Sequence, residues 1–377
     1  MPRISLSNFH FARPLAAYNR RMKAWRQSFR PVALAAAIAV AALQTCAAAE
    51  AQNLPGGTAQ SIPVGDAPVV RVDLRSATRL IIKTAERRSV EIESTGPVVA
   101  QHFGAQQVGA ALRPQIDVFA ATVQGPMGQI TLLPENFVLP PLRGGQHDGV
   151  EIRGIDAGEV TITIPESTAL LIAHLERGRM VVRNYREGIF ISRVHNGSLM
   201  LNADSGAGFA EVARGPLVVQ QSSFERLRAR TAMGNVLFEH CSARQIEVTS
   251  VLGNIVYDNG SFGSGLARFE SLNGNVALGI GTGGVRIGAH SAAGRIYTSL
   301  DGSARVSGSG SDLQAQVNGG GPVVTASSGS GAVYVYGGSL RRDRTMGNGW
   351  GMMRSIMTRR HPAPVRARTF GAPQHRV

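Results

Sequence analysis

Gly234-Asn235-Val236-Leu237-Phe238 opens a stretch in which one short pattern recurs at a nearly constant interval. The later copies read Gly253-Asn254-Ile255-Val256-Tyr257, Gly274-Asn275-Val276-Ala277-Leu278 and Gly294-Arg295-Ile296-Tyr297. The interval is about 20 residues, and a fixed interval of this length is typical of architectures in which structural repeats are stacked. The pattern therefore predicts a repeat protein.

The same interval continues toward both ends of the chain. Earlier glycines stand at Gly158, Gly178, Gly197 and Gly215, and Gly331 follows Gly294 after about two intervals. The residues two and four positions after each glycine are mostly apolar. Because side chains alternate between the two faces of a strand, these two columns share one face, and we expect them to form the core.

A single repeat of this kind cannot bury its apolar face alone, whereas stacked repeats merge their apolar columns into one interior. Glycine suits a sharp corner in each repeat. Asn235, Asn254 and Asn275 directly follow the corner glycines, and we expect their amides to hydrogen-bond along the stack. A second apolar pattern later in each interval gives each repeat at least two strands. The sequence thus predicts an all-β fold, a β-solenoid with rungs of about 19–21 residues.

Composition agrees with this fold class. The 377-residue chain contains 45 glycines and only 17% charged residues, which fits corner-rich β-structure better than a helical protein. The formal net charge of +14 comes almost entirely from arginine, since Lys23 and Lys83 are the only lysines. An arginine excess can reflect genome composition, so we do not interpret it as a nucleic-acid-binding signal.

Residues 1–51 have the features of an export signal. A basic segment precedes a short alanine-rich apolar segment over residues 31–43, and small residues before Gln52 offer a cleavage site. A retained anchor, a twin-arginine signal at Arg20-Arg21 and a lipoprotein signal at Cys46 are open alternatives. Once this segment is removed only Cys241 remains, so the mature chain can form no internal disulfide. We expect an exported protein of the bacterial periplasm or cell surface.

The rest of the chain divides into four predicted segments. Residues 52–68 are rich in glycine and proline and are predicted to be a linker. Alternation of apolar and polar residues predicts a small N-terminal β module over residues 69–150, and the β-solenoid is expected over residues 151–337. Residues 338–377 form a basic tail.

The basic tail contains many arginines, three prolines and one acidic residue, a composition typical of disorder. We expect it to contact anionic surfaces, either membrane lipids or envelope polymers, through Arg341, Arg342, Arg344, Arg359 and Arg360. A tail that only solvates the protein is the alternative.

The segment from Val160 to Val182, in which a strand closing on Pro165 is followed by a strand, a glycine and another strand, resembles the bacterial DUF4097/DUF2807 families. These families are described as adhesin-like or auto-transporter adhesin-head (GIN) domains. The resemblance covers roughly residues 70–337. It implies a single-stranded, right-handed β-solenoid in the cell envelope, an adhesin-like role and no established catalytic residues. The basic N-terminus and the basic tail depart from a minimal domain of these families.

One pair of carboxylates offers an enzymatic alternative. Glu239 and Asp258 stand five positions after successive glycines, so we expect them to face outward on adjacent rungs, about 5 Å apart. This separation approaches that of the carboxylates in retaining glycosidases, and His240 beside them could carry a proton. An ordinary solvated face is the simpler interpretation, with a polysaccharide-degrading enzyme as the alternative.

The position three residues after each glycine forms an apolar stripe. If the core columns face inward, this column faces outward, and soluble monomers rarely expose large contiguous apolar patches. The stripe is expected either to bind a partner or a second copy, or to be covered by another part of the chain. It consists of Met200, Val218, Leu237, Val256, Tyr297 and Tyr334.

The sequence predicts neither a metal site nor a cofactor. The histidines lie in separate repeats without a ligand spacing, and Cys241 lacks the partners of a catalytic nucleophile. The sequence favours a non-catalytic binding or scaffolding surface. Its expected partner is an envelope polysaccharide or another envelope protein.

Overall fold

The computed structural model describes residues 52–54, 58–103, 121–125, 128–132, 148–186, 188–300 and 304–337. The chain divides into two units between residues 50 and 51, and all described residues belong to the second. Every regular element in these ranges is a β-strand, and no helix among them could span a membrane. The predicted export signal and the predicted basic tail lie outside the described residues.

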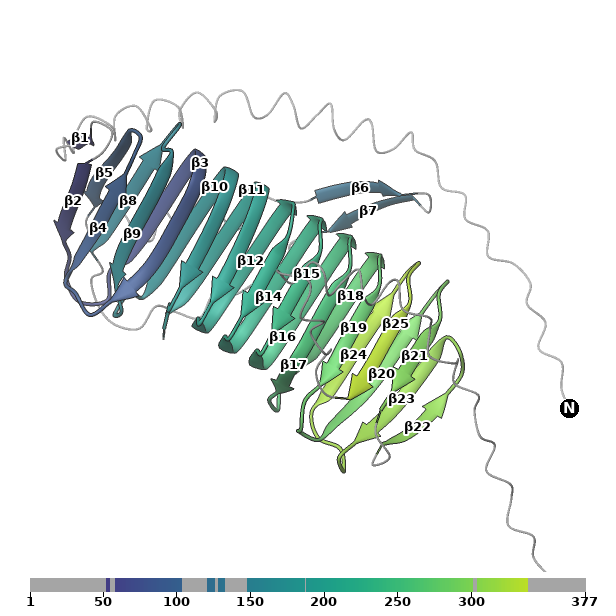
Figure 1. Ribbon diagram of the computed structural model, residues 1–377. Helices are drawn as coiled ribbons and strands as arrows, with labels where there is room; N and C mark the ends of the chain where they lie inside the picture. Colours follow the sequence, from purple (N-terminus) through teal and green to yellow (C-terminus); the bar gives the residue numbers. More distant parts are fainter. Residues whose placement is uncertain are drawn as a thin grey trace, which may run out of the picture. The chain divides into compact units, whose positions relative to one another are not determined.

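The middle of the second unit is a solenoid-like stack of parallel strands, in which each strand pairs with the strand one repeat later (Figure 1). Strands β10 and β11 each run without a break through the corner glycine of their repeat, and each later repeat contributes a longer strand and then a shorter one. In β15 and β17, for example, Val236 pairs with Ile255, an offset of 19 residues. The strands are β10 (Leu170–Arg183), β11 (Ile189–Asn202), β12 (Ser205–Arg214), β13 (Leu217–Gln220), β14 (Ser223–Met233), β15 (Val236–Glu239), β16 (Ser242–Leu252), β17 (Ile255–Phe262), β18 (Ala267–Asn273) and β19 (Val276–Ile280).

The recurring glycines form one corner of the stack. Gly215 has a φ of +128°, and a Cβ atom there would overlap the carbonyl oxygen of Gly197 on the neighbouring rung, so no other residue fits without strain. The predicted amide stack follows this corner. The backbone N–H of Asn254 donates to Asn235 Oδ1 (2.9 Å), and that of Asn275 donates to Asn254 Oδ1 (2.8 Å). Side-chain carbonyls thus satisfy backbone donors that the turn leaves unpaired.

The core lies between the longer and the shorter strands. Phe238 and Tyr257, four residues after their corner glycines, are fully buried, and their ring centroids are 5.7 Å apart. The Tyr257 hydroxyl lies 2.9 Å from the carbonyl oxygen of Cys241 and 3.0 Å from that of Ser261, so its one proton has an acceptor and burying it leaves no unpaired donor. Each fully buried large apolar side chain contributes about 1.5–3 kcal/mol, so such columns can stabilise the fold without disulfides.

The N-terminal end of the stack differs from the expected order. Strand β3 (Val69–Ala85) pairs in parallel with β10 on one side and with β8 (Gly149–Gly154) and β9 (Glu159–Pro165) on the other. Figure 1 shows this purple strand between teal ones. Residues 69–85, assigned from the sequence to a separate N-terminal module, therefore lie inside the stack. A β-period pattern places a strand in a sheet without saying which neighbours it takes.

Antiparallel strands complete this end. β4 (Ser89–Ser94) pairs with β9 and with β2 (Thr58–Pro63), and β5 (Val98–Phe103) pairs with β8 and with β1 (Gln52–Leu54). The predicted linker over residues 52–68 is thus wrong for β1 and β2, because these short segments pair with a sheet edge. A two-stranded hairpin, β6 (Ala121–Gly125) and β7 (Gly128–Leu132), forms a sheet of its own.

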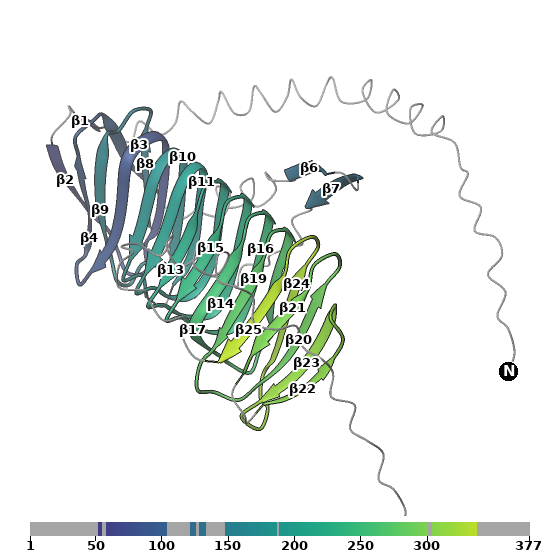
Figure 2. The ribbon, with the colours of Figure 1, turned by 45° about the vertical axis from the view of Figure 1, so that its right-hand side comes forward.

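The C-terminal end also breaks the sequence order. β24 (Val323–Ser328) pairs in parallel with β18 and with β20 (Val285–Ser291), and β25 (Val333–Gly337) pairs with β19 and with β21 (Ile296–Ser299). The corner of Gly331 therefore lies between those of Gly274 and Gly294, whereas the sequence pattern places it two rungs beyond Gly294. β23 (Asp312–Val317) pairs antiparallel with β20, and β22 (Arg305–Gly308) pairs antiparallel with β23. Figures 1 and 2 show yellow strands between green ones here.

Candidate functional site

The apolar stripe forms one continuous column on the shorter strands. Val218 pairs with Leu237, Leu237 with Val256, and Val256 with Ala277. The column continues through Tyr334 to Tyr297, whose rings stack with centroids 5.1 Å apart. At its other end Met200 pairs with Val218. The structure therefore brings together all six residues selected from the sequence.

This column is not an open surface. Leu237 is 6% exposed, Val256 2% and Tyr297 9%, while Met200, Val218 and Tyr334 are half-buried. The expectation that alternation leaves these residues facing solvent is wrong, because alternation decides the face of a sheet and not what covers it. Of the two interpretations of the stripe, burial within the chain matches the structure.

Glu239 and Asp258 are neighbours on adjacent rungs, as expected, but they are buried rather than solvated. Glu239 Oε2 accepts a hydrogen bond from Gln220 Nε2 (2.6 Å), and Asp258 Oδ1 accepts one from the Tyr336 hydroxyl (3.3 Å). Burial raises the pKa of the Tyr336 phenol, and the Asp258 carboxylate raises it further, so that hydroxyl remains a donor.

The Tyr336 ring reaches Asp258 because a glycine stands between them. A Cβ atom at Gly279 would come within 2.7 Å of that ring. His240, the proposed proton carrier, is exposed and occupies a left-handed corner with a φ of +54°. The expected outward-facing acid pair is thus a pair of enclosed carboxylates, each with a side-chain donor.

Two buried groups in the middle of the stack titrate far from their ordinary range. Burial raises the pKa of Asp204 to about 8, although its carboxylate accepts backbone hydrogen bonds from Tyr185 (2.8 Å) and Asn202 (2.9 Å). Burial also raises the pKa of the Cys241 thiol to about 11, which keeps it protonated and poorly nucleophilic. Asp204 thus connects two turns, a role that the spacing of the repeats does not indicate.

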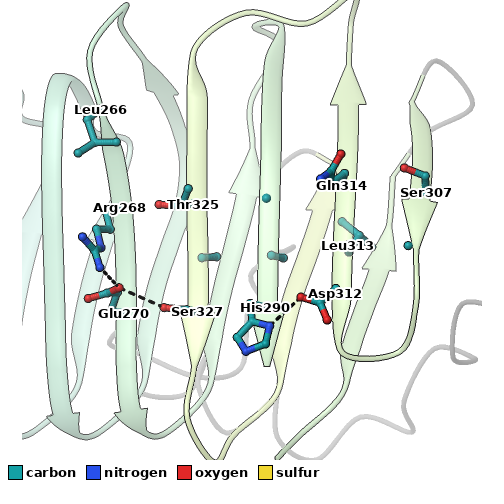
Figure 3. A pocket seen from close by; sticks show the side chains of 14 residues that line it. Leu266, Arg268, Glu270, His290, Ser307, Asp312, Leu313, Gln314, Thr325 and Ser327 are labelled. Carbon is teal, nitrogen blue, oxygen red and sulfur yellow. Dashed lines mark hydrogen bonds and ion pairs between the residues drawn. The ribbon is translucent and has the colours of Figure 1, made fainter. Parts of the chain in front are cut away.

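An open groove of about 590 Å³ lies on the outer face of β18, β24, β20, β23 and β22 (Figure 3). Two rows of side chains cross these strands, since residues paired in register lie side by side. The first row is Arg268, Thr325, Gly288, Gln314 and Ser307, and the second is Glu270, Ser327, His290 and Asp312.

The charged side chains of the groove are held by one another. Arg268 forms an ion pair with Glu270 (2.5 Å), whose carboxylate also accepts a hydrogen bond from Ser327 Oγ (3.5 Å). His290 Nδ1 and Asp312 Oδ1 are hydrogen-bonded, at a distance of 2.7 Å. The hydrogen bond from His290 holds the pKa of the Asp312 carboxyl below its usual range. The groove therefore presents pre-positioned donors and acceptors.

Gly288 forms an open place in the floor of this groove. It is an interior residue of β20, paired on both sides, and a Cβ atom there would have no protein atom within 4 Å. Glycine weakens the interior of a strand, and it often marks a place where a ligand approaches closely. Packing within the chain does not explain this glycine, in contrast to the corner glycines.

No metal centre is found among the described residues, where no three His, Cys, Asp or Glu side chains gather closely enough to hold an ion. No pattern in the sequence indicates the groove. Its residues come from segments spanning 266–327, and their order across the sheet depends on the insertion of β24, which regular spacing cannot reveal.

Comparisons with known proteins add little to these observations. No protein-family model matches the chain, and no curated protein matches it. A solved structure described as "a putative cell adhesion protein" from Clostridium sporogenes ATCC 15579 shares 11% identity, with 74% of this chain and 99% of that chain covered. The TM-score is 0.15, which is too low to establish a shared fold.

Proposed function

We propose that this chain is an exported, non-catalytic binding protein of the bacterial cell envelope, which uses the groove over Gly288 to hold a polar polymer, most simply a glycan. The proposed fold is a single-stranded, right-handed β-solenoid of the adhesin-like DUF4097/DUF2807 kind. Its handedness follows the strong preference of parallel strand crossovers. The single observation that carries the proposal is the open floor at Gly288, which stands within the first of the two rows of polar side chains.

The chemistry of the groove suits a ligand with many hydroxyl groups. A sugar hydroxyl both donates and accepts, and the groove offers donors at Arg268 and Gln314, acceptors at Glu270 and Asp312, and a hydroxyl at Ser307. Charge-assisted hydrogen bonds are the stronger ones, and here the charged groups are already oriented by their own partners. An open groove accommodates an internal segment of a polymer.

The enzymatic alternative gains no support from the pair on which it depends. Glu239 and Asp258 are each 3% exposed, and neither lines the groove. A hydrolytic pair needs room for the substrate and for an attacking water between acid and base. We therefore retain binding without turnover as the proposed function.

The test is a substitution that fills the floor of the groove. Gly288→Ile places a β-branched side chain on a strand, where it meets no protein atom. Gly283→Ile is the matched control, because a Cβ atom there also meets nothing within 4 Å and the residue lies outside the groove. Both variants should fold as the parent chain does.

Binding is measured by retention on a panel of envelope and extracellular polysaccharides, while polymer length is followed in the same experiment. We expect retention by at least one polymer of unchanged length, weakened about tenfold or more by Gly288→Ile, or roughly 1.4 kcal/mol, and unchanged by Gly283→Ile. Shortened polymer would point to the enzyme. Retention that Gly288→Ile leaves intact would remove the groove from the proposal.

A contribution of the basic tail is proposed separately. Residues 341–377 are expected to bind anionic lipid or polymer, and added salt should weaken that binding because exposed charges are screened. Removing these residues should abolish salt-sensitive liposome binding and leave the Gly288-dependent retention unchanged. A protein partner in the envelope is the outcome indicated if neither polysaccharide nor lipid is bound.

A further inference from the structure

The segment Pro322–Gly337, which we call the inserted rung, occupies a slot whose two walls are both made earlier in the chain. One wall is β18 and β19, and the other is β20 and β21. All four strands end by residue 299, whereas the inserted rung begins more than twenty residues later. It is therefore the last part of the stack to reach its place during synthesis.

Before the inserted rung arrives, the slot is bordered by unpaired strand edges on both sides. Such edges are templates for pairing with any strand of matching sequence. The slot also fits particular side chains of the inserted rung, since Val324, Val333 and Val335 are completely or almost completely buried in it. Ser328 Oγ donates to the Gly274 carbonyl oxygen on one wall (2.8 Å), and the Gly331 carbonyl oxygen accepts from Ser291 Oγ on the other (2.8 Å).

A short turn carries the chain into the slot. β23 and β24 lie on opposite sides of β20, so residues 318–322 must cross the start of that strand. Three consecutive residues, Asn318, Gly319 and Gly320, have φ values of +48°, +80° and +87°. None of the wall contacts of the inserted rung described above involves this turn. The turn is held by exposed hydrogen bonds, from Asn318 Nδ2 to the Thr282 carbonyl oxygen (3.2 Å) and from Arg286 Nε to the Gly321 carbonyl oxygen (3.1 Å). Opening the turn into an extended hinge breaks these bonds and leaves the pairing of the rung in place.

We propose that the inserted rung is exchanged between copies of this chain, so that the slot of one copy accepts residues 322–337 of a second copy. A second copy is the fitting occupant because it carries the one sequence that the slot is already seen to bury. Reciprocal exchange closes a dimer, and one-way exchange extends an open chain of copies. Exchange needs no new contact beyond those in the single chain, apart from the opened hinge.

The N-terminal end provides the internal contrast. β3 also lies between two rungs, but it precedes both β8–β9 and β10 in the chain. Later strands can add to either side of it, so no slot has to open. Exchange is therefore inferred for the C-terminal end alone, and it stands independently of the proposed ligand.

The experiment uses the full chain with Cys46→Ser, so that introduced cysteines are the exposed ones. One population carries Arg268→Cys and the other Thr325→Cys; these positions are paired between β18 and the inserted rung. The two populations are unfolded together, refolded over a range of concentrations and oxidised. Exchange joins the two cysteines in one slot and gives a covalent dimer containing one copy of each.

The control is a mixture of Arg226→Cys and Gln245→Cys, which are paired in the same way between β14 and β16 in the middle of the stack. We expect a several-fold excess of covalent dimer for the 268/325 mixture over this control, rising with protein concentration. A single chain carrying both Arg268→Cys and Thr325→Cys verifies that the geometry permits the disulfide. If that chain forms its internal disulfide and the mixture gives no more dimer than the control, exchange is excluded. If that chain fails to form it, the pairing on which exchange rests is wrong and the proposal falls as well.

Discussion

The middle of the stack and its C-terminal end use glycine for opposite purposes. At Gly215 a backbone carbonyl occupies the place of a side chain, so glycine is required by the next rung. At Gly288 the same place is empty, and the glycine leaves a hollow that faces solvent. Packing of the stack requires glycine at position 215 and does not require it at position 288. Because Gly288 lies in the floor of a polar groove, its lack of a side chain is better explained by a bound ligand than by packing.

The two regions also differ in how the chain builds them. In the middle each rung follows its neighbour in the sequence, so contacts are short-range and the repeat pattern predicts them. At the end the inserted rung pairs on one side with β18 and β19, which lie more than 50 residues earlier in the chain. The groove exists only because of that long-range insertion, since Thr325 and Ser327 belong to the inserted rung.

The largest expected effect separates the two kinds of glycine. Gly215→Ala should lower the free energy of unfolding by at least about 3 kcal/mol, since it combines a left-handed backbone with overlap of a neighbouring carbonyl. Gly288→Ala should lower the free energy of unfolding by less than about 0.5 kcal/mol. Urea unfolding of the two variants measures both changes. Equal losses of stability would contradict the difference between the crowded corner glycine and the open groove glycine.

A pH dependence should come from the middle of the stack. The pKa of Asp204 is raised by burial from an ordinary value of 3.8 to about 8. Because the folded pKa is the higher one, its stabilisation is fully present below pH 3.8 and is lost as pH rises through about 8. We expect the free energy of unfolding to fall by more than about 2 kcal/mol between pH 4 and pH 9.

Asp204→Asn should remove much of that slope, measured as urea unfolding at a series of pH values. Asp312, at the C-terminal end, makes a natural control. Its pKa is lowered, so its stabilisation is present above its ordinary range and is lost only at more acidic pH. A slope that Asp204→Asn leaves unchanged would show that this carboxyl is not responsible for it.

A smaller effect tests whether the apolar stripe is covered. Leu237→Ala should cost about 2–3 kcal/mol if the side chain is buried as the structure has it. Val323→Ala, at a residue 44% exposed on the inserted rung, should cost less than about 0.5 kcal/mol. Thermal or urea unfolding distinguishes the two. A negligible cost for Leu237→Ala would restore the interpretation of the stripe as an open partner surface.

The smallest effect concerns the groove floor. Gly288→Thr should raise the free energy of unfolding by up to about 1 kcal/mol, because it replaces a flexible residue in the interior of a strand with one that favours strands. The same variant should weaken polymer retention. Lower stability together with unchanged retention would show that Gly288 serves the fold after all.

The sequence was sufficient for the parts that repeat. Corner glycines such as Gly234, the amides of Asn235 and Asn254 and the core column of Phe238 and Tyr257 follow from spacing and alternation, because each depends on its nearest rungs. The pairing of Glu239 with Asp258 follows for the same reason.

The rest depended on long-range placement. Gly274 and Gly294 are about 20 residues apart, as neighbouring rungs are, yet the rung of Gly331 lies between them. The spacing of the glycines gives the length of a rung, but it does not indicate whether a later segment of the chain is inserted between two rungs. The burial of Leu237 and Glu239 was missed because alternation does not say what covers a face, and the groove was missed because its rows cross an order of strands that only folding establishes.

The most direct test of this account asks which strand lies beside β18. Two chains are compared, one with Arg268→Cys and Thr325→Cys, the other with Arg268→Cys and Gly288→Cys, both with Cys46→Ser. The structure pairs residue 268 with 325, and residue 288 stands one strand further away, at about twice the strand spacing of 4.8 Å. On mild oxidation at low concentration the first chain should form an internal disulfide and the second should not. A disulfide between 268 and 288, and none between 268 and 325, would mean that the rungs stack in sequence order and that neither the groove nor the inserted rung exists as described.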